Sequence, residues 1–486
     1  MAIDLVTRKV IPIQPVKPVG VKDASEFSLY EKTAKVYPRS VSGPFARLRW
    51  LMVWLTQIVF YGLPWLQWNG RQAVLFDLAE RRFYVLGLVL HPQDFIYLAV
   101  LLIIAALALF FFTAVAGRLW CGYACPQTVY TEIFLWVERH TEGDRQARMR
   151  LDSAPWSVRK ITRKGAKQLL WIGIALLTGL TFVGYFSSIR GMLFELTSST
   201  FSSWEWFWVL FYGLATYGNA GFLREQICKH MCPYARFQSA LIDMDSMVIA
   251  YDEQRGESRG SRPRGADPAT LGLGDCIDCT LCVQVCPTGI DIRKGLQNEC
   301  IACAACIDVC DQVMRKMDYP KGLIRYTSGN GIVQQLGARQ IIGRISRPRV
   351  WIYCSLLLLV CGAFTFSLMT RKSFSVDVIK DRGSLAREVG PGEIENVYRM
   401  QIMNGLEEKQ RFTISVSGLA GLRISSDTQL AVDAVGIGSL PIRLTLPPEV
   451  SALYRGKTLP VVFEVQTSAG SGHESKQEKS TFYVLP

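Results

Sequence analysis

The residues best suited to chemistry in this chain are cysteines, and twelve of the fourteen fall into four short motifs. The two densest motifs occupy residues 276–310, and both have the spacing C-x2-C-x2-C-x3-C. This run holds pairs of [4Fe–4S] clusters in bacterial proteins, where three thiolates bind one cluster and the fourth binds the other. The spacing therefore predicts two cluster sites that exchange one ligand each. The first set is Cys276, Cys279, Cys282 and Cys310, and the second is Cys300, Cys303, Cys306 and Cys286.

Zinc and disulfides are the alternatives for these eight cysteines. Structural zinc takes four ligands, commonly from two C-x2-C pairs, and does not require two interlocked runs of four. Disulfides need an oxidising compartment, whereas the topology predicted below places this segment in the cytoplasm. Pro287 follows the first run, as is common in ferredoxins, but Asp311 follows the second. The fit to the ferredoxin pattern is therefore closer at Cys286 than at Cys310.

Two further cysteine pairs share the pattern C-x3-C-P. Thiols at i and i+4 lie on one face if the segment is helical, and the proline either starts a helix or marks a break. Each pair follows an apolar run, so we expect the two pairs to lie at the same membrane depth and to converge. Four soft thiolates select Cu(I), zinc or an iron–sulfur cluster over hard cations. The pairs are Cys121 with Cys125, and Cys228 with Cys232.

Other residues near these motifs give weaker signals. His230 and Met231 lie inside the second pair and are candidate additional ligands. The basic Lys229 and His230 are expected to lower the pKa of the Cys228 thiol. Two lone cysteines in an apolar run are interpreted as packing residues, and three isolated histidines as ordinary surface or interface residues. These are Cys354, Cys361, His91, His140 and His473.

Several common motifs do not occur in the sequence. It contains no G-x-G-x-x-G after a strand, no Walker A motif, no H-E-x-x-H and no C-x-x-C-H. It therefore has no recognisable nicotinamide site, hydrolytic metal site or c-type haem attachment site. Electrons must come from a donor that the sequence does not identify.

Apolar runs indicate a membrane protein with a bundle of about five transmembrane helices. Apolar residues make up 49% of the chain. They are concentrated in runs close to the roughly 20 residues that span a bilayer. The net charge of +13 would suggest nucleic acid in a soluble protein. Here the charge lies in loops beside apolar runs, so membrane lipid is the expected partner and nucleic acid is not. The predicted spans are 50–68, 95–116, 168–186, 206–222 and 350–370.

The lysines and arginines between these runs predict an orientation. The connecting segments hold nine, three, ten, one and seventeen of them in order, and the dense segments are expected in the cytoplasm. This places the N-terminus, the 117–167 loop and the cysteine-rich segment in the cytoplasm, and the C-terminal segment in the periplasm. No cleavable signal peptide is expected, because the first 46 residues are polar. The predicted location is the bacterial inner membrane.

The same boundaries divide the chain into five parts. A cytoplasmic tail (1–49) precedes the transmembrane helices that carry both C-x3-C-P motifs (50–250). A ferredoxin-like insert for two [4Fe–4S] clusters (251–349) begins with a Gly/Arg/Ser-rich segment, 251–275, which is expected to be a mobile linker. A last span (350–370) leads to a domain at 373–486. Alternating stretches there, at 397–403, 411–417, 442–446 and 461–467, predict an all-β Ig-like sandwich that binds partners or acts as a scaffold.

Together these features resemble a known family. The segments G-R-L-W-C-G-Y-A-C-P (117–126) and K-H-M-C-P (229–233), the two-cluster insert and the β-domain resemble the cytochrome c oxidase accessory proteins CcoG, FixG and RdxA. The resemblance covers essentially the whole chain. Membrane ferredoxins of periplasmic nitrate and nitrous-oxide reductases have similar paired motifs but lack the sandwich, so the β-domain favours the oxidase-accessory family.

The resemblance implies a cupric reductase that makes Cu(I) for assembly of a cbb-type cytochrome c oxidase. Copper would then pass to an exporting ATPase and to oxidase-assembly proteins. It further implies that the copper and redox cysteines are those of the two C-x3-C-P motifs, and that the cluster ligands are the eight cysteines of 276–310. Two other functions remain open. One is a membrane electron relay between a quinol or soluble donor and another redox complex, with copper incidental. The other is a copper chaperone whose clusters are structural.

Overall fold

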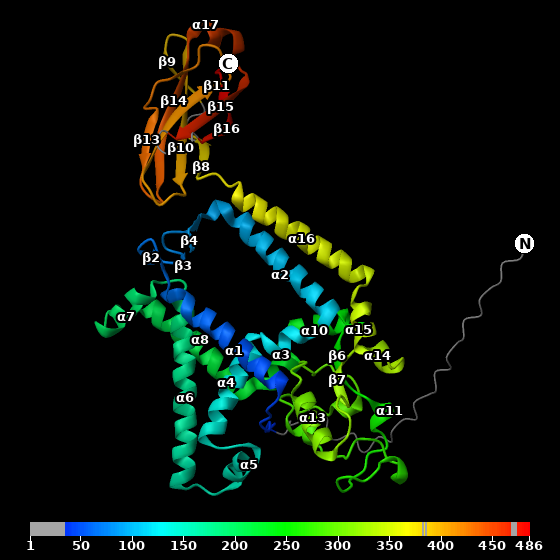
Figure 1. The fold of residues 1–486 in the computed structure, drawn as a ribbon. Helices are drawn as coiled ribbons and strands as arrows, with labels where there is room; N and C mark the ends of the chain where they lie inside the picture. The colour runs from blue at the N-terminus through cyan, green and yellow to red at the C-terminus, as the bar shows by residue number, and fades with distance from the viewer. Residues whose placement is uncertain (1–34, 382, 384–385, 468–473) are drawn as a thin grey trace, which may run out of the picture.

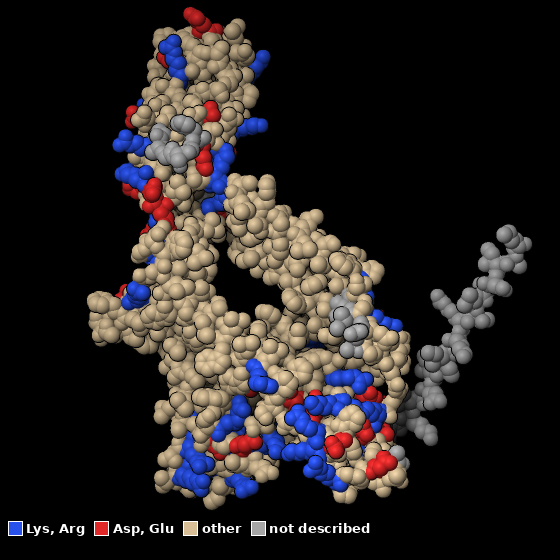
Figure 2. All heavy atoms as spheres, in the orientation of Figure 1, with Lys and Arg blue, Asp and Glu red and all other residues tan. Residues whose placement is uncertain are grey.

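The computed structural model describes residues 35–381, 383, 386–467 and 474–486. His473 and the first 34 residues of the predicted tail lie outside this range. Three parts follow one another in space (Figure 1): a cysteine-rich unit at one end, helices in the middle and a β-domain at the other end. On the face shown in Figure 2, charged side chains gather at the two ends and leave an apolar belt over the helices between them. This distribution is typical of a membrane-spanning chain.

Three helices in the described residues are long and apolar enough to cross a membrane: α2 (Phe95–Ala116), α6 (Val158–Val183) and α16 (Pro348–Met369). The other two predicted spans correspond to α1 (Pro44–Gly62) and α8 (Ser203–Gly218). Helix α1 ends before Pro64, which cannot continue the helical hydrogen bonds. At 1.5 Å per residue, α8 is about 24 Å long and falls short of a hydrocarbon layer of roughly 30 Å. Five spans therefore remain a prediction.

The helices pack as two groups. Helices α6 and α8 approach so closely that a Cβ at Gly179 would lie 2.3 Å from the Val209 carbonyl oxygen. Small residues allow this close approach of backbones in membrane helices. Helices α2 and α16 run side by side from the cysteine-rich unit to the β-domain (Figure 1). At their far end the Tyr97 hydroxyl lies 3.2 Å from Ser367 Oγ.

The β-domain has two antiparallel sheets, which confirms the predicted Ig-like sandwich. One sheet has the order β12-β14-β10-β8, with β9 also paired to β10, and the other has the order β13-β11-β15-β16. The four predicted strands lie within β10 (Glu393–Asn404), β11 (Gln410–Ser417), β14 (Ile437–Leu446) and β15 (Thr458–Thr467). The remaining strands are β8 (Phe374–Lys380), β9 (Arg387–Gly390), β12 (Arg423–Ile424), β13 (Gln429–Val432) and β16 (Ser475–Tyr483). Alternate side chains of the central strands, such as Phe412 and Phe463, are fully buried between the sheets.

A small sheet between α1 and α2 supports the β-domain. It consists of β3 (Val74–Asp77), β4 (Arg82–Val85) and β5 (Leu88–Leu90). The Arg71 guanidinium near this sheet pairs with Glu407 of the β-domain, and Arg371 pairs with Asp94 at 2.6 Å. The first pair joins this region to the β-domain, and the second fixes the chain just after α16 against the start of α2.

The cysteine-rich unit is closed by two paired strands, β6 (Val248–Tyr251) and β7 (Ile324–Thr327). Between them lie α11 (Glu253–Gly256), α12 (Leu281–Gln284) and α13 (Ala305–Met317). The segment predicted to be a free linker folds back on this unit. Arg255 pairs with Asp275 at 2.5 Å, and Arg262 donates to the Tyr319 hydroxyl at 2.9 Å. Arg255 and Arg262 of this segment therefore have partners that composition alone did not indicate.

Candidate functional site

The eight cysteines of 276–310 line two adjacent cavities. The first has an empty volume of about 370 Å³ and is lined by Cys276, Cys279, Cys282 and Cys310. The second has an empty volume of about 340 Å³ and is lined by Cys300, Cys303, Cys306 and Cys286, with Cys282 also on its wall. The fold thus brings each predicted set of four together, with three cysteines from one run and the fourth from the other.

The backbone around the cavities suits an anionic cluster. Asp278 and Thr280 in the first run have φ of 53° and 56°, and Ala302 and Ala304 at the same places in the second have 56° and 59°. Non-glycine residues rarely adopt this left-handed conformation. Left-handed residues in such turns direct successive N–H groups into one concavity, as in many iron–sulfur sites. The starts of α12 and α13 follow directly and add the positive ends of helix dipoles.

A single metal ion fits these residues less well. Across the described ranges, no three His, Cys, Asp or Glu side chains lie close enough together to hold one ion. Spread thiols around an empty volume match a multi-iron cluster better than mononuclear zinc. The same observation holds for the C-x3-C-P cysteines, so a copper ion bound there would require those side chains to move closer together.

Burial keeps the unliganded thiols protonated. It raises the pKa of Cys300 to about 12, that of Cys310 to about 12 and that of Cys282 to about 11. Nearby cysteines raise these values further, and for Cys310 they are the other three members of its predicted set. Metal sites bind thiolate, so loading of either cavity must release protons.

Both C-x3-C-P motifs break a helix at the same place, so each pair does not lie on one continuous helical face. Cys121 lies in α3 (Leu119–Tyr123), and Cys125 is the extended residue before α4 (Pro126–Thr141). Cys228 lies in a π-helical turn (Ile227–Met231), and Cys232 is the extended residue before α10 (Pro233–Leu241). Each proline is the first residue of the new helix, where its missing N–H has no cost.

The two pairs interact electrostatically. Burial raises the pKa of Cys121 to about 12, and Cys125, Cys228 and Cys232 all add to this shift. Burial also raises the pKa of Cys228 to about 11, followed by the effects of Cys125 and Cys232. The expectation that Lys229 and His230 lower the pKa of Cys228 is therefore wrong, because burial and the neighbouring cysteines raise that pKa and the cation that opposes them is Arg118. The candidate ligands His230 and Met231 are both exposed, and Met231 is 63% exposed.

The remaining residues singled out in the sequence lie apart from this site. His91 is buried, 4% exposed, which excludes a surface position, one of the two positions expected for it. The His140 ring lies against Trp136, and its Nδ1 is 2.8 Å from the Trp136 carbonyl oxygen. Cys354 and Cys361 are partly buried within α16.

The first C-x3-C-P motif contacts the loop that lines the second cavity. A Cβ at Gly122 would lie 2.7 Å from the carbonyl oxygen of Ala302 and 2.8 Å from that of Ile301. Arg118 donates to the carbonyl oxygens of Asn298 and Cys300 with one nitrogen, and to that of Ala235 with another. Backbone contact and one arginine therefore join the C-x3-C-P cysteines to the 300–306 loop.

A buried ion triad holds the second motif against the first. Glu138 accepts from Arg148 Nη1 at 2.6 Å and from Arg224 Nη2 at 2.8 Å, and all three side chains are buried. Gln127 Nε2 donates to the carbonyl oxygens of Asn219 and Arg224, just before the turn that carries Cys228. Our sequence analysis missed these residues. Charged residues beside apolar runs are expected in a membrane protein, so the sequence offered no signal that set these residues apart.

Helix α1 is fixed directly to α13. The Asp308 carboxylate accepts from the N–H groups of Phe45 at 3.3 Å and Ala46 at 2.7 Å, at the start of α1. Arg49, one turn later, donates to the Cys303 carbonyl oxygen at 2.5 Å. Side chains that satisfy the free N–H groups of a first helical turn stabilise it. The helical part and the cysteine-rich unit are thus joined at the second cavity.

The fold and the site define a membrane-associated iron–sulfur redox protein of the ferredoxin type. Three family models match the chain: a 4Fe-4S binding domain over residues 98–143, a 4Fe-4S dicluster domain over 223–329, and the IG-like fold at the C-terminal of FixG over 364–484.

Similar proteins extend this match to most of the chain. Nitrogen fixation protein FixG of Rhizobium meliloti is 36% identical over 450 residues, which cover 86% of each chain. Protein RdxA of Cereibacter sphaeroides is 38% identical, and the match covers 86% of this chain and 91% of RdxA. Protein RdxB of the same organism is 40% identical, and the match covers 83% of this chain and 86% of RdxB. The chain belongs to the FixG/RdxA family. A crystal structure of a FixG-related protein from Vibrio parahaemolyticus is 20% identical with a TM-score of 0.19, covering 23% of this chain and 97% of its own.

Proposed function

We propose that this protein reduces Cu(II) to Cu(I) in support of cbb-type cytochrome c oxidase assembly. The observation that carries the proposal is the backbone contact between Gly122, in the C-G-Y-A-C segment, and Ile301 and Ala302, in the loop that lines the second cysteine-lined cavity. The segment on one side of this backbone contact carries the thiols of Cys121 and Cys125, and the loop on the other side lines the proposed cluster cavity. An arrangement of this kind suits one-electron reduction of a metal ion that thiolates bind.

The two cavities are proposed to hold one [4Fe–4S] cluster each, with the two exchanged sets of four cysteines as ligands. When bound, such clusters store and release single electrons, over a range of about −700 to +450 mV set by their surroundings. The chain's own contribution is to exclude water with apolar residues such as Ile249, Ile292 and Met314. Its left-handed turns would also offer backbone N–H groups to the sulfurs of a bound cluster.

Copper is the substrate of the proposed reaction. The four C-x3-C-P thiols would bind it, lose their protons and favour the reduced ion, because thiolate is a soft ligand. The Cu(I) product would pass to a copper-exporting ATPase and to oxidase-assembly proteins. The proposal also includes five spans across a bacterial inner membrane. The N-terminus and the cluster unit lie in the cytoplasm, and the β-domain lies in the periplasm. The two charged ends and the apolar belt in Figure 2 support the placement in a membrane.

The test is a single-turnover assay. Purified protein is reduced with dithionite, freed of reductant and mixed with Cu(II), and the Cu(I) formed is trapped with a chromogenic chelator. We expect rapid Cu(I) formation that is lost when Cys121, Cys125, Cys228 and Cys232 are all changed to Ser. Cys354→Ser with Cys361→Ser is the matched control, because these cysteines lie within α16. Equal rates in the four-Ser protein with unchanged iron content would refute copper reduction at this site.

One observation favours a membrane electron relay as the second candidate. The 4Fe-4S binding family model covers residues 98–143, where Cys121 and Cys125 are the two cysteines. If the C-x3-C-P thiols hold a further cluster, the protein would contain about twelve irons per chain, against about eight for two [4Fe–4S] clusters. Iron analysis of anaerobically purified protein separates the two candidates. Twelve irons, reduced to eight in the four-Ser variant, would favour the relay.

A further inference from the structure

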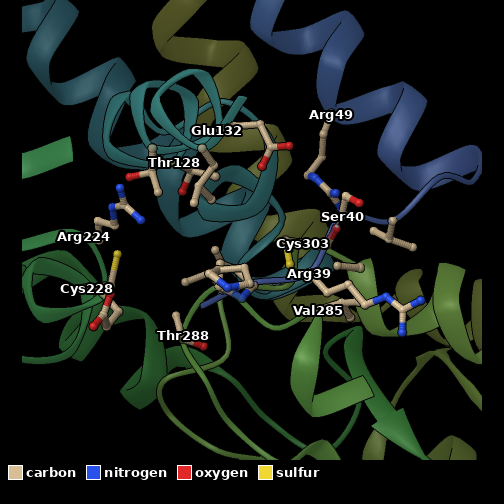
Figure 3. A pocket seen from close by; sticks show the side chains of 18 of the residues that line it. Arg39, Ser40, Arg49, Thr128, Glu132, Arg224, Cys228, Val285, Thr288 and Cys303 are labelled. Carbon is tan, nitrogen blue, oxygen red and sulfur yellow. Dashed lines mark hydrogen bonds between the residues drawn. The ribbon is translucent and has the colours of Figure 1, made fainter. Parts of the chain in front are cut away.

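A third cavity has Cys228 in its wall. Its empty volume is about 810 Å³, and its walls come from α1, α4, the turn that carries Cys228 and the loops around the second cluster cavity. Figure 3 shows Cys228 and Arg224 on one side of this space, and Arg49, Glu132 and Cys303 on the other. The cavity therefore adjoins both a C-x3-C-P thiol and a cysteine of the second cluster set.

The wall of this cavity is positively charged. It contains five arginines but only two glutamates, and adding the buried Glu138 behind the wall still leaves an excess of positive charge. Arg49 is buried and donates to a carbonyl oxygen, not to a carboxylate within ion-pair distance. Arg148 is 3% exposed, and its Nε has no hydrogen-bond partner in the described parts of the chain. The charged lining residues are Arg39, Arg49, Arg139, Arg148, Arg224, Glu132 and Glu225.

An outer cavity continues this charge toward the surface. It has an empty volume of about 760 Å³ and shares Arg39, Ser40, Val41 and Arg139 with the inner one. Its other cation is Lys316, and its lining contains no acidic residue. Low-dielectric walls with charge of one sign concentrate ions of the opposite sign. The two cavities together carry an excess of positive charge between the surface and Cys228, and this excess favours anions.

The lining also argues against an aromatic ligand. None of the inner cavity's lining residues is aromatic, so a flavin or quinone ring would have no stacking partner. Arginines instead match carboxylate groups, which they bind with two parallel hydrogen bonds. A bare Cu(II) ion would meet repulsion in the outer cavity, whose lining contains cations and no carboxylate.

We propose that copper enters through these cavities as an anionic chelate, a small complex whose carboxylate groups give it net negative charge. The arginines hold the carboxylates while Cys228 exchanges for one copper ligand. In that exchange a copper–carboxylate bond breaks and a copper–sulfur bond forms. The thiol proton passes to the departing carboxylate. The inference rests on the proposed function and names its substrate class.

The experiment compares two copper complexes of opposite charge. Copper(II) nitrilotriacetate carries net negative charge, and copper(II) bis(ethylenediamine) carries net positive charge. Both are titrated calorimetrically into the full-length oxidised protein and then used as substrates in the single-turnover assay. The test variant combines Arg39→Gln, Arg139→Gln and Lys316→Gln, and a matched control removes three exposed cations outside both cavities. The control substitutions are Arg150→Gln, Arg159→Gln and Lys294→Gln.

We expect the wild-type protein to prefer the anionic complex. The test variant should bind that complex about tenfold more weakly, which is the low end of the range by which a charged cleft concentrates its ligand. The control variant should bind it as tightly as the wild-type protein does. Equal loss for both complexes, or none, would overturn the proposal, as would equally tight binding of copper-free nitrilotriacetate. If neither complex is reduced but the affinity difference persists, the anion path stands and the proposed copper reduction fails.

Discussion

Substitution of Gly122 by Ala tests whether the contact between the two parts of the site matters. The added Cβ would lie 2.7 Å from the Ala302 carbonyl oxygen and 2.8 Å from that of Ile301. The closer contact is about 0.7 Å inside the 3.4 Å at which ordinary contact begins. Both opposing atoms belong to backbone, so neither can swing aside as a side chain could. The C-G-Y-A-C loop and the 300–306 loop must therefore move apart.

The expected cost of the substitution is that of overpacking, about 1–3 kcal/mol. The intrinsic preference of helices for alanine over glycine, about 1 kcal/mol, offsets part of it. We expect a lower temperature for loss of the iron–sulfur absorbance and slower Cu(I) formation from pre-reduced protein. Cu(I) formation should suffer more, because the strain falls on the contact between the cysteine pair and the second cavity.

The control for this prediction is Gly173→Ala in α6. A Cβ at Gly173 would meet nothing within 4 Å, so this change carries the helix preference without the clash. The reasoning is refuted if Gly122→Ala retains wild-type iron content, thermal midpoint and Cu(I) formation. Equal losses in both variants would also contradict it, because they would point to a general effect of alanine.

Three further predictions concern carboxylates and use the thermal midpoint of the detergent-solubilised protein. Glu138→Gln leaves two buried arginines without their carboxylate and should lower the free energy of unfolding by about 3–5 kcal/mol. The control is Glu80→Gln, which should change the midpoint little, because Glu80 is 64% exposed and its ion pair with Arg82 is 3.8 Å long. Asp308→Asn weakens the capping of α1 and should cost about 0.5–2 kcal/mol. Burial acts to raise the pKa of Asp152, but hydrogen bonds from two lysines and a tyrosine outweigh it and hold that pKa below its usual value. Asp152→Asn should therefore lower the midpoint at about pH 7, and the difference should shrink as the pH falls below the ordinary carboxylate pKa of about 3.9.

Each of these predictions has a contradicting result. A stable Glu138→Gln protein would show that its arginines find other partners or water. An Asp308→Asn protein with an unchanged midpoint would show that water replaces the cap of α1. A pH-independent difference for Asp152→Asn would mean that the folded and unfolded states share one pKa at that carboxyl, because only a pKa difference makes stability depend on pH.

The sequence predicted the parts of this protein that depend on local spacing. Two C-x2-C-x2-C-x3-C runs identified the cluster cavities, because three thiols two residues apart must surround one cluster whatever the rest of the chain does. Alternating strands predicted the sandwich, since the side chains of a strand point to opposite faces in turn. The apolar runs likewise located α2, α6 and α16, whose length and composition suffice for a span.

Tertiary structure decided how these parts meet. The fit of Gly122 against Ala302 and the capping of α1 by Asp308 each bring together residues that are distant in sequence. The helix breaks at both C-x3-C-P motifs depend on contacts of this kind. The excess of cations around Cys228 comes from three separate segments of the sequence, which contain Arg39 and Arg49, Arg139 and Arg148, and Arg224. Spacing in a sequence fixes what lies within a turn or two of the backbone. Contacts between distant segments follow only from the packing of the whole chain, so the sequence indicated the chemistry and the fold determined its surroundings.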